Sequence, residues 1–132
     1  MTKEQIDLVR SSFSNIDDPI ALTTQFYENL FEINPSLKEL FKKDLRVQKK
    51  MLADALKYVV DELDNFDKIK ADIQKLGARH VNYGVKAEDY GTVGTALVMA
   101  LESKLGNGFS PEVKNSWLTA YTILADTMIN VQ

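Results

Sequence analysis

Apolar residues recur every three or four positions along almost the whole chain, which is the spacing of one face of an α-helix. Strand-like alternation never extends beyond a few residues. The pattern predicts an all-α protein of about six to seven helices. The predicted stripes are Ile6, Val9, Phe13, Ile16; Leu22, Phe26, Tyr27, Leu30, Phe31, Ile33; Leu37, Leu40, Phe41; Leu52, Leu56, Val59, Val60, Leu63; Phe66, Ile69, Ile73, Leu76; Tyr90, Val93, Leu97, Leu101, Leu105; and Val113, Trp117, Tyr121, Leu124, Met128.

Capping residues and helix breakers divide these stripes into separate helices. Thr2 and Gln5 have the spacing of a capping box, and three further pairs join a side-chain cap to a proline in the first turn. These pairs are Asp18–Pro19, Asn34–Pro35 and Ser110–Pro111, and breaks are expected at 42–44, 64–65, 82–84 and 106–108. Because the chain contains no repeat or long linker, we treat residues 1–132 as a single domain.

Length and charge limit the class of function. The 132 residues suit one domain, and 16 Lys+Arg against 19 Asp+Glu give a net charge of −3. So mild and evenly spread a charge does not favour nucleic-acid or membrane-surface binding. The first residues lack the apolar core of an export signal, and the longest uncharged run, 90–101, is shorter than the ~20 residues of a spanning helix. We therefore expect a cytoplasmic protein without a membrane partner.

The sequence contains no cysteine and a single histidine, His80, at the end of its apolar stripe. This count excludes disulfides, thiol catalysis and zinc sites that need two or more Cys or His ligands. One interpretation of His80 is a half-buried core residue whose ring nitrogens bond to backbone or water. The other is a ligand to a haem, which brings its own four in-plane ligands and needs only one histidine. The pattern alone leaves both open.

Six segments in order resemble the single-domain, Vitreoscilla-type bacterial haemoglobins of the flavohaemoglobin family. They are FYENLF (26–31), LKELF (37–41), VQKKML (47–52), HVNYGV (80–85), DYGTVG (89–94) and WLTAY (117–121). The resemblance extends from about residue 4 to the end. It implies a globin fold, a three-over-three helical sandwich without a distinct fourth short helix, and haem b (iron protoporphyrin IX) as the cofactor.

The resemblance also implies roles for six residues. His80 matches the proximal iron ligand, and Tyr90 matches the tyrosine behind it. Phe41 matches the phenylalanine that wedges against the haem face. Tyr27 and Gln48 match the distal pair that hydrogen-bonds the ligand, and Leu52 matches the apolar residue that closes the distal pocket.

The residues themselves support part of this assignment. Gln48 and Leu52 are four positions apart and share a helix face, and Tyr27 lies on the broad apolar face of its helix. Each also has a plain alternative, Tyr27 as a core aromatic residue and Gln48 as a solvated residue near a helix start. Because His80 is the only histidine, a second histidine cannot occupy the distal side.

One residue departs from the family pattern, and one charged cluster lies outside it. The family's proximal glutamate on the last helix corresponds to Gln132, and a neutral amide does not replace a carboxylate that strengthens the histidine–iron bond. Lys42, Lys43, Arg46, Lys49 and Lys50 form a basic cluster, which is either solvated surface or a site for haem propionates or an acidic reductase.

We therefore expect an oxygen-binding haem protein that stores or delivers O2, with NO and CO as competing ligands. Tyr27 and Gln48 would slow ligand release by donating hydrogen bonds to the bound gas. An enzymatic alternative is NO dioxygenase activity supported by a separate reductase, because no flavin or nicotinamide domain follows in the sequence. A third alternative is a haem-free, globin-like sensor or interaction module.

Overall fold

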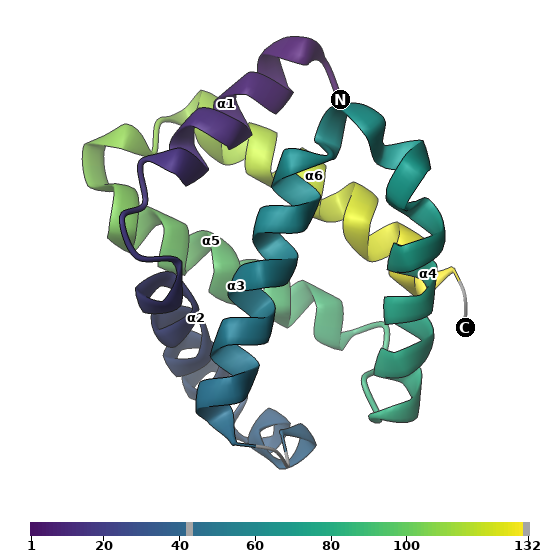
Figure 1. The fold of residues 1–132 in the computed structure, drawn as a ribbon. Coiled ribbons are helices and arrows are strands. Elements are labelled where there is room, and N and C mark those ends of the chain that lie inside the picture. The colour runs from purple at the N-terminus through teal and green to yellow at the C-terminus, as the bar shows by residue number, and fades with distance from the viewer. Residues whose placement is uncertain (42–43, 131–132) are drawn as a thin grey trace.

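The computed structural model describes residues 1–41 and 44–130, which form six α-helices and three short 3-10 helices without a strand (Figure 1). This confirms the all-α prediction. The α-helices are α1 (Lys3–Ser14), α2 (Pro19–Ile33), α3 (Leu45–Asp61), α4 (Phe66–Asn82), α5 (Asp89–Leu105) and α6 (Pro111–Ile129). The 3-10 helices are η1 (Pro35–Leu40), η2 (Leu63–Asn65) and η3 (Gly106–Gly108). None of the described helices is both long and apolar enough to cross a membrane.

Helix starts follow the capping residues that the sequence predicts. The Thr2 hydroxyl accepts a hydrogen bond from the Gln5 backbone, and the Gln5 side chain accepts one from the Thr2 backbone. The Asp18 carboxylate accepts from the backbone N–H of Ile20, and Ser110 caps α6 in the same way through Val113. Each cap satisfies a backbone donor that lacks a partner in the first helical turn, which is why these positions begin helices.

Ile16 and Leu63 lie outside the α-helices whose stripes they continue, just as Phe41 lies directly after the end of η1. Ile16 is buried, but α1 ends at Ser14 and the chain then turns. Leu63 lies in η2, beyond the end of α3, and packs against the main core. In both places the apolar residue keeps its position in the core while the backbone leaves helical geometry, so periodicity predicts burial better than it predicts the helix end.

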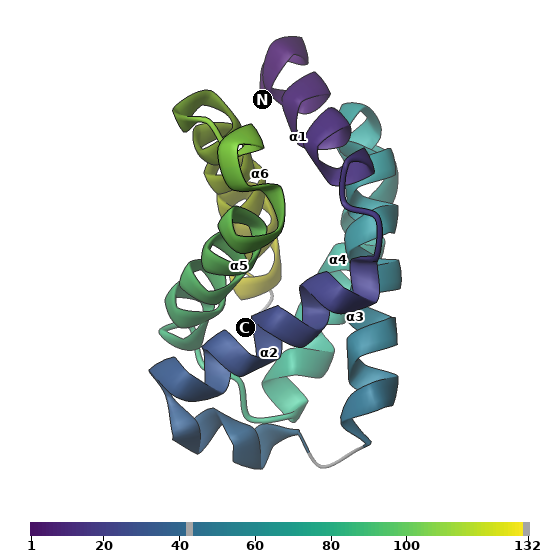
Figure 2. The ribbon, with the colours of Figure 1, turned by 90° about the vertical axis from the view of Figure 1, so that its left-hand side faces the viewer.

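The helices form two layers (Figure 2). Helices α1, α3 and α4 lie on one side and α5 and α6 on the other, and α2 crosses beside α3 and packs extensively on α5. Helices α3 and α4 meet at η2 and then diverge toward the other end of the molecule, with little direct contact between them (Figure 1). This divergence separates the first turns of α3 from the last turns of α4.

Buried apolar side chains form two clusters. The larger joins α1, α2, α3, α5 and α6 around residues such as Leu22, Leu30 and Leu101. The smaller joins α4 to the start of α5 and the end of α6 through Ile69, Ile73 and neighbouring residues. A domain of this size usually has one contiguous core. The division sets α4, the helix of the single histidine, apart from α2 and α3.

Candidate functional site

Tyr27 lies at the centre of an aromatic cluster at the junction of α2 and η1. Its ring centroid is 5.2 Å from that of Phe41 in an edge-to-face arrangement, 5.9 Å from Phe31 and 5.0 Å from Phe26. Edge-to-face rings at these distances attract each other beyond simple area burial. The structure therefore brings together Tyr27 and Phe41, two of the residues that the resemblance singled out, on one apolar surface.

Burial keeps the Tyr27 hydroxyl protonated further into the alkaline range than in an exposed tyrosine. The side chain is only 5% exposed, and burial raises the pKa of its hydroxyl to about 12. Taking a phenolate out of water is costly, so the neutral phenol persists well above neutral pH. Tyr27 is therefore a hydrogen-bond donor under physiological conditions.

Gln48 and Leu52 lie in the first two turns of α3 and are both half-buried. Leu52 packs against the larger core cluster, which includes Tyr27. The described residues include no hydrogen bond between the Gln48 amide and the Tyr27 hydroxyl. Because Gln48 is also partly exposed, its role in a pocket stays a prediction.

His80 is half-buried in the last turn of α4, and its Nδ1 lies 2.8 Å from the backbone oxygen of Leu76. Because a carbonyl only accepts hydrogen bonds, Nδ1 carries the proton and Nε2 carries the lone pair. Burial lowers the pKa of the imidazole, which favours this neutral form. Among the described residues nothing bonds to Nε2. A neutral ring held through Nδ1 with Nε2 available has the form of a single-histidine metal ligand.

Tyr90 lies behind His80, with ring centroids 6.5 Å apart. Its side chain is 6% exposed, and its hydroxyl is buried without a hydrogen-bond partner in the described structure. A buried hydroxyl normally has a partner, because an unmade hydrogen bond costs about 1–3 kcal/mol. Gln132, the residue that the resemblance placed nearest to this pair, lies outside the described residues.

Tyr121 is a residue of this region that sequence reasoning assigned only to a helix face. Its ring packs against Gly94, where a Cβ atom would lie 2.8 Å from the ring, and its hydroxyl donates to the backbone oxygen of Tyr90 at 2.6 Å. The bond fixes the start of α5 against α6 and so holds Tyr90 in place. Gly94, the second glycine of the DYGTVG segment, was the only sequence signal for this close approach.

The elements that carry these residues lie at the same end of the molecule. The end of η1, the start of α3 and the end of α4 all lie at the lower end in Figures 1 and 2. The larger core cluster includes Tyr27, and Phe41 and Leu52 pack against it. The smaller cluster includes Tyr90, which lies beside His80, and Leu76, whose carbonyl bonds to His80, packs against it. A flat apolar group between a histidine and an aromatic cluster would join the two, so the residues present fit a haem.

A bare metal ion fits less well. Within the described residues, no three His, Asp or Glu side chains gather closely enough to hold one. Protein sites for unligated metal ions need such a set, whereas a haem iron needs one axial histidine.

Comparison with known proteins decides the family. The globin family profile matches residues 24–128, which include Tyr27, the aromatic cluster, Gln48, His80 and Tyr90. The chain belongs to the globin family. The expected fold class is therefore confirmed.

The relatives of this globin include longer proteins. A flavohemoprotein from Bacillus thuringiensis is 31% identical over the whole of this chain, which covers 33% of the relative. A flavohemoprotein from Chromobacterium violaceum is also 31% identical over 86% of this chain, covering 29% of the relative. The chain thus spans about a third of the length of these curated relatives and is homologous to their globin part.

Solved structures show the same fold. A bacterial globin from Campylobacter jejuni superposes with a TM-score of 0.86 at 28% identity, covering 98% of this chain and 95% of that one. An engineered carbene transferase from Rhodothermus marinus gives 0.88 at 28% identity, covering 98% and 92%. The CO form of haemoglobin from Mustelus griseus gives 0.80 at 18% identity, covering 97% of each chain, and shows the fold alone.

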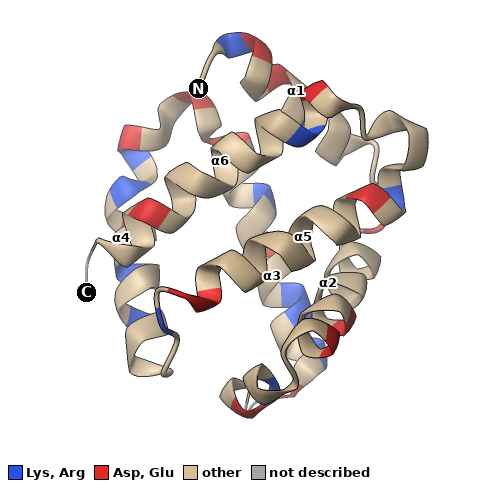
Figure 3. Ribbon diagram, turned by 180° about the vertical axis from the view of Figure 1, so that it is seen from behind, with Lys and Arg blue, Asp and Glu red and all other residues tan. Residues whose placement is uncertain are grey.

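The basic cluster near the start of α3 is only partly described, because Lys42 and Lys43 lie outside the described residues. Lys and Arg residues recur along α3 and α4 (Figure 3). Arg46 pairs with Asp44 at 3.0 Å and Lys50 with Asp54 at 2.9 Å, all four well exposed to solvent. Such pairs contribute little to stability. Their pairing favours the interpretation as solvated surface.

Proposed function

We propose that this globin binds haem through His80 and takes up O2 reversibly, with NO and CO as competing ligands. The observation that carries the proposal is the state of His80, a neutral ring held at Nδ1 by the Leu76 carbonyl with Nε2 available. Haem supplies an iron centre that binds such diatomic gases. The chain's part is to hold that centre and to surround the ligand with suitable side chains.

On the side of the aromatic cluster, the proposal assigns two donors to the ligand. The neutral Tyr27 phenol and the Gln48 amide would donate hydrogen bonds to a gas ligand that carries partial negative charge. Phe41 and Leu52 would provide the apolar walls that keep water out. Two such bonds stabilise a bound ligand by about 1–3 kcal/mol, which appears as slower release.

Absorption spectroscopy tests the haem proposal directly. We expect the purified protein, after addition of haemin, to show a Soret band, and the dithionite-reduced sample to bind CO reversibly. His80→Ala should lose the imidazole-ligated spectrum and regain it on addition of free imidazole, whereas Tyr83→Ala, which removes an exposed neighbour of His80, should keep it. A protein that stays colourless with haemin would contradict the proposal and favour the haem-free alternative.

Stopped-flow kinetics test the role of Tyr27. We expect Tyr27→Phe to speed O2 dissociation about tenfold, because it removes one donor without changing the packing of the ring. Tyr58→Phe is the matched control, since Tyr58 is exposed and its hydroxyl bonds to Asp72 on α4. Equal dissociation rates in Tyr27→Phe and the unaltered protein would refute the distal assignment.

NO dioxygenation is the second candidate, favoured by the flavohemoprotein relatives and by the Rhodothermus marinus neighbour, a candidate nitric oxide dioxygenase. The same pocket would serve it, with a separate reductase as partner. The described partner of the His80 Nδ1 proton is a backbone carbonyl, which donates less electron density than a carboxylate and favours reversible binding. Nitrate formed from NO and O2 in the presence of a reductase would establish the enzymatic function.

The subfamily, the haem type and the location of this globin are further parts of the proposal. A bacterial globin of about this length is supported by the Campylobacter jejuni globin, which this chain covers to 95%, whereas single-domain status, the Vitreoscilla-type resemblance and haem b stay predictions. The cytoplasmic location and the assignment of residues 1–132 as one domain stay predictions. Extraction of the pigment as a pyridine haemochrome identifies the haem type.

A further inference from the structure

Thr23 joins the two helices that carry the proposed distal donors. Its side chain is completely buried in α2, and its Oγ1 lies 3.0 Å from the backbone oxygen of Lys49 in α3. The same oxygen atom lies 3.1 Å from the carbonyl of Ile20 in its own helix. One hydroxyl proton is therefore shared between a local acceptor and an acceptor on the neighbouring helix.

The position of this bond relates it to the candidate site. Thr23 precedes Tyr27 by one helical turn, and Lys49 directly follows Gln48. Residues four apart lie on the same face of a helix, so Thr23 and Tyr27 both face α3 or the space beside it. The hydrogen bond thus ties together the two stretches of backbone from which Tyr27 and Gln48 extend.

Comparison with the next residue shows that this bond is not an ordinary property of threonine in a helix. Thr24 also donates to the Ile20 carbonyl, at 2.8 Å, and has no partner on another helix among the described residues. A threonine that bonds only to its own preceding turn is common in helix interiors. Thr23 is the one of the pair whose hydroxyl reaches α3, and it does so where the exposed fraction of its side chain is zero.

We propose that Thr23 is a positioning residue that sets the spacing between the Tyr27 hydroxyl and the Gln48 amide and so controls how long the gas ligand is retained. The proposal rests on the proposed function. Two donors act together only when both point at the ligand, because a hydrogen bond weakens steeply as the donor–hydrogen–acceptor angle departs from linearity. Without the hydrogen bond between α2 and α3, the two helices can shift relative to each other. Both donor side chains are still present, but their orientation toward the ligand is less well fixed.

Thr23→Val is the main test, because valine has nearly the shape of threonine and lacks the hydroxyl. Thr23→Ser keeps the hydroxyl, and Thr24→Val is the matched control that removes a hydroxyl bonded only within α2. Two measurements use the loaded protein: the C–O stretching band of the CO complex, which reports the field of the distal donors, and O2 dissociation. A third uses the haem-free protein: the carbonyl ¹³C NMR shift of Lys49.

We expect Thr23→Val to shift or broaden the C–O band, to speed O2 dissociation about three- to tenfold, and to move the Lys49 carbonyl signal. Thr23→Ser and Thr24→Val should stay close to the unaltered protein in all three measurements. Thr23→Ala provides a second hydroxyl-free variant if valine does not fold in this position, and the same changes are expected of it.

The outcomes separate this inference from the proposed function. If Tyr27→Phe changes the C–O band and the dissociation rate while the hydroxyl-free variants of Thr23 leave both within twofold, Thr23 does not position the donors and the function stands. If Tyr27→Phe also changes neither, the distal pair is wrong and the inference falls with it. If the chain takes up no haem, the proposed function fails, and an unmoved Lys49 carbonyl signal in Thr23→Val overturns the helix link as well.

Discussion

At the scale of single residues, burial keeps the hydroxyl of Tyr27 protonated in alkaline solution. In the unfolded chain a tyrosine ionises near pH 10, whereas burial raises the pKa of Tyr27 to about 12. Between these values the unfolded state loses the proton and the folded state does not. The contribution of this group to stability is therefore complete below pH 10 and is lost as the pH rises toward 12.

This difference predicts the pH dependence of unfolding. From pH 9 to pH 11 the free energy of unfolding should fall by about 1 kcal/mol more in the unaltered protein than in Tyr27→Phe, because the variant has no proton to lose at this position. Urea titrations of both proteins at the two pH values measure the difference. Identical falls would mean that the Tyr27 ring is far more accessible to water than its 5% exposure indicates.

The candidate residues differ in how far the sequence could identify them. His80 was identifiable because it is the only histidine, and the aromatic residues of α2 lay on a visible apolar face. Thr23 and Tyr121 were not identifiable, since their roles depend on hydrogen bonds to backbone oxygens of another helix. Such bonds follow from where helices cross, and a crossing point is not encoded in the periodicity of either helix.

At the scale of elements, α4 and α6 cross at a glycine. A Cβ atom on Gly77 would lie 2.5 Å from the backbone oxygen of Met128, a distance that real contacts do not reach. The obstacle is main chain rather than a flexible side chain, so it moves only if the helices separate. In the sequence Gly77 interrupts a helical stripe between Leu76 and His80, and the structure supplies the reason for it.

Gly77→Ala should therefore destabilise the fold by about 1–3 kcal/mol, the range expected for overpacking against a rigid neighbour. Gly91→Ala is the matched control, because a Cβ there meets nothing within 4 Å and alanine favours the helix by about 0.5 kcal/mol or more. Chemical denaturation of the two variants gives both values. If Gly77→Ala were as stable as Gly91→Ala, the close approach of α4 and α6 would be wrong.

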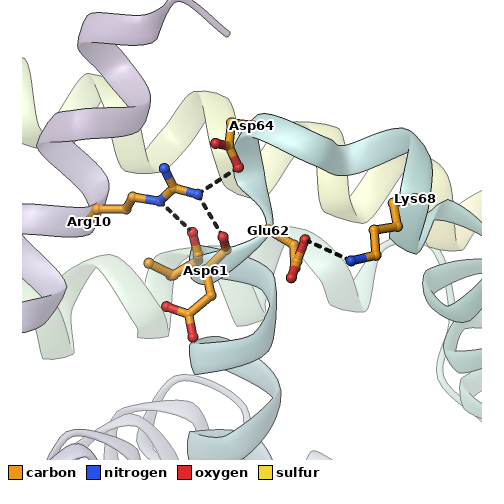
Figure 4. A network of polar contacts seen from close by, with 6 residues as sticks. Arg10, Asp61, Glu62, Asp64 and Lys68 are labelled. Atoms are coloured by element: carbon orange, nitrogen blue, oxygen red, sulfur yellow. Dashed lines mark hydrogen bonds and ion pairs between the residues drawn. The ribbon is translucent and has the colours of Figure 1, made fainter.

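Arg10 fastens α1 to the end of α3 (Figure 4). Its guanidinium donates to the backbone oxygens of Val60 and Asp61 at 3.1 and 2.6 Å and to the carboxylate of Asp64 at 2.7 Å. Carbonyl groups in the last turn of a helix lack partners within it, so a cationic fork is well suited to bind them. The pairing raises the pKa of Arg10 and lowers that of Asp64.

Replacing Arg10 by lysine keeps the positive charge but removes the forked guanidinium, and with it the hydrogen bonds to the two backbone carbonyls. The free energy of unfolding should therefore fall by about 1 kcal/mol. Arg46→Lys serves as the control, since Arg46 is highly exposed and pairs only with exposed Asp44, and its effect should be close to zero. Thermal unfolding followed by circular dichroism compares them. Equal midpoints for the two variants would show that Arg10 does not anchor α3.

Local signals predicted the elements well where the physical cause was itself local. Caps at Thr2, Asp18 and Ser110 placed helix starts correctly, because a cap bonds within its own first turn. The segment after Asn34 was expected only as a short helix, and the structure shows a 3-10 helix. That distinction depends on how the segment packs beneath α2, which no cap encodes.

At the scale of the whole molecule, the division of the core makes α4 depend on a partner. In the described structure α4 packs mainly on α6 through the smaller cluster, whereas α2 and α5 share an extensive interface within the larger one. Local unfolding takes the lowest free energy where few buried apolar contacts hold an element. A haem ligated by His80 and packed against the aromatic cluster would add contacts on the side of α4 that faces α2 and α3.

Hydrogen exchange followed by mass spectrometry therefore offers a test of the whole arrangement. In the haem-free protein we expect amides of α4 to exchange at least about tenfold faster than those of α5, and addition of haemin to slow α4 far more than α5, because a ligand that binds only the folded state stabilises what it contacts. In His80→Ala, haemin should protect α4 much less, since the link from the cofactor to that helix is gone. Equal protection of both helices before and after haemin would show that the two clusters act as one cooperative core.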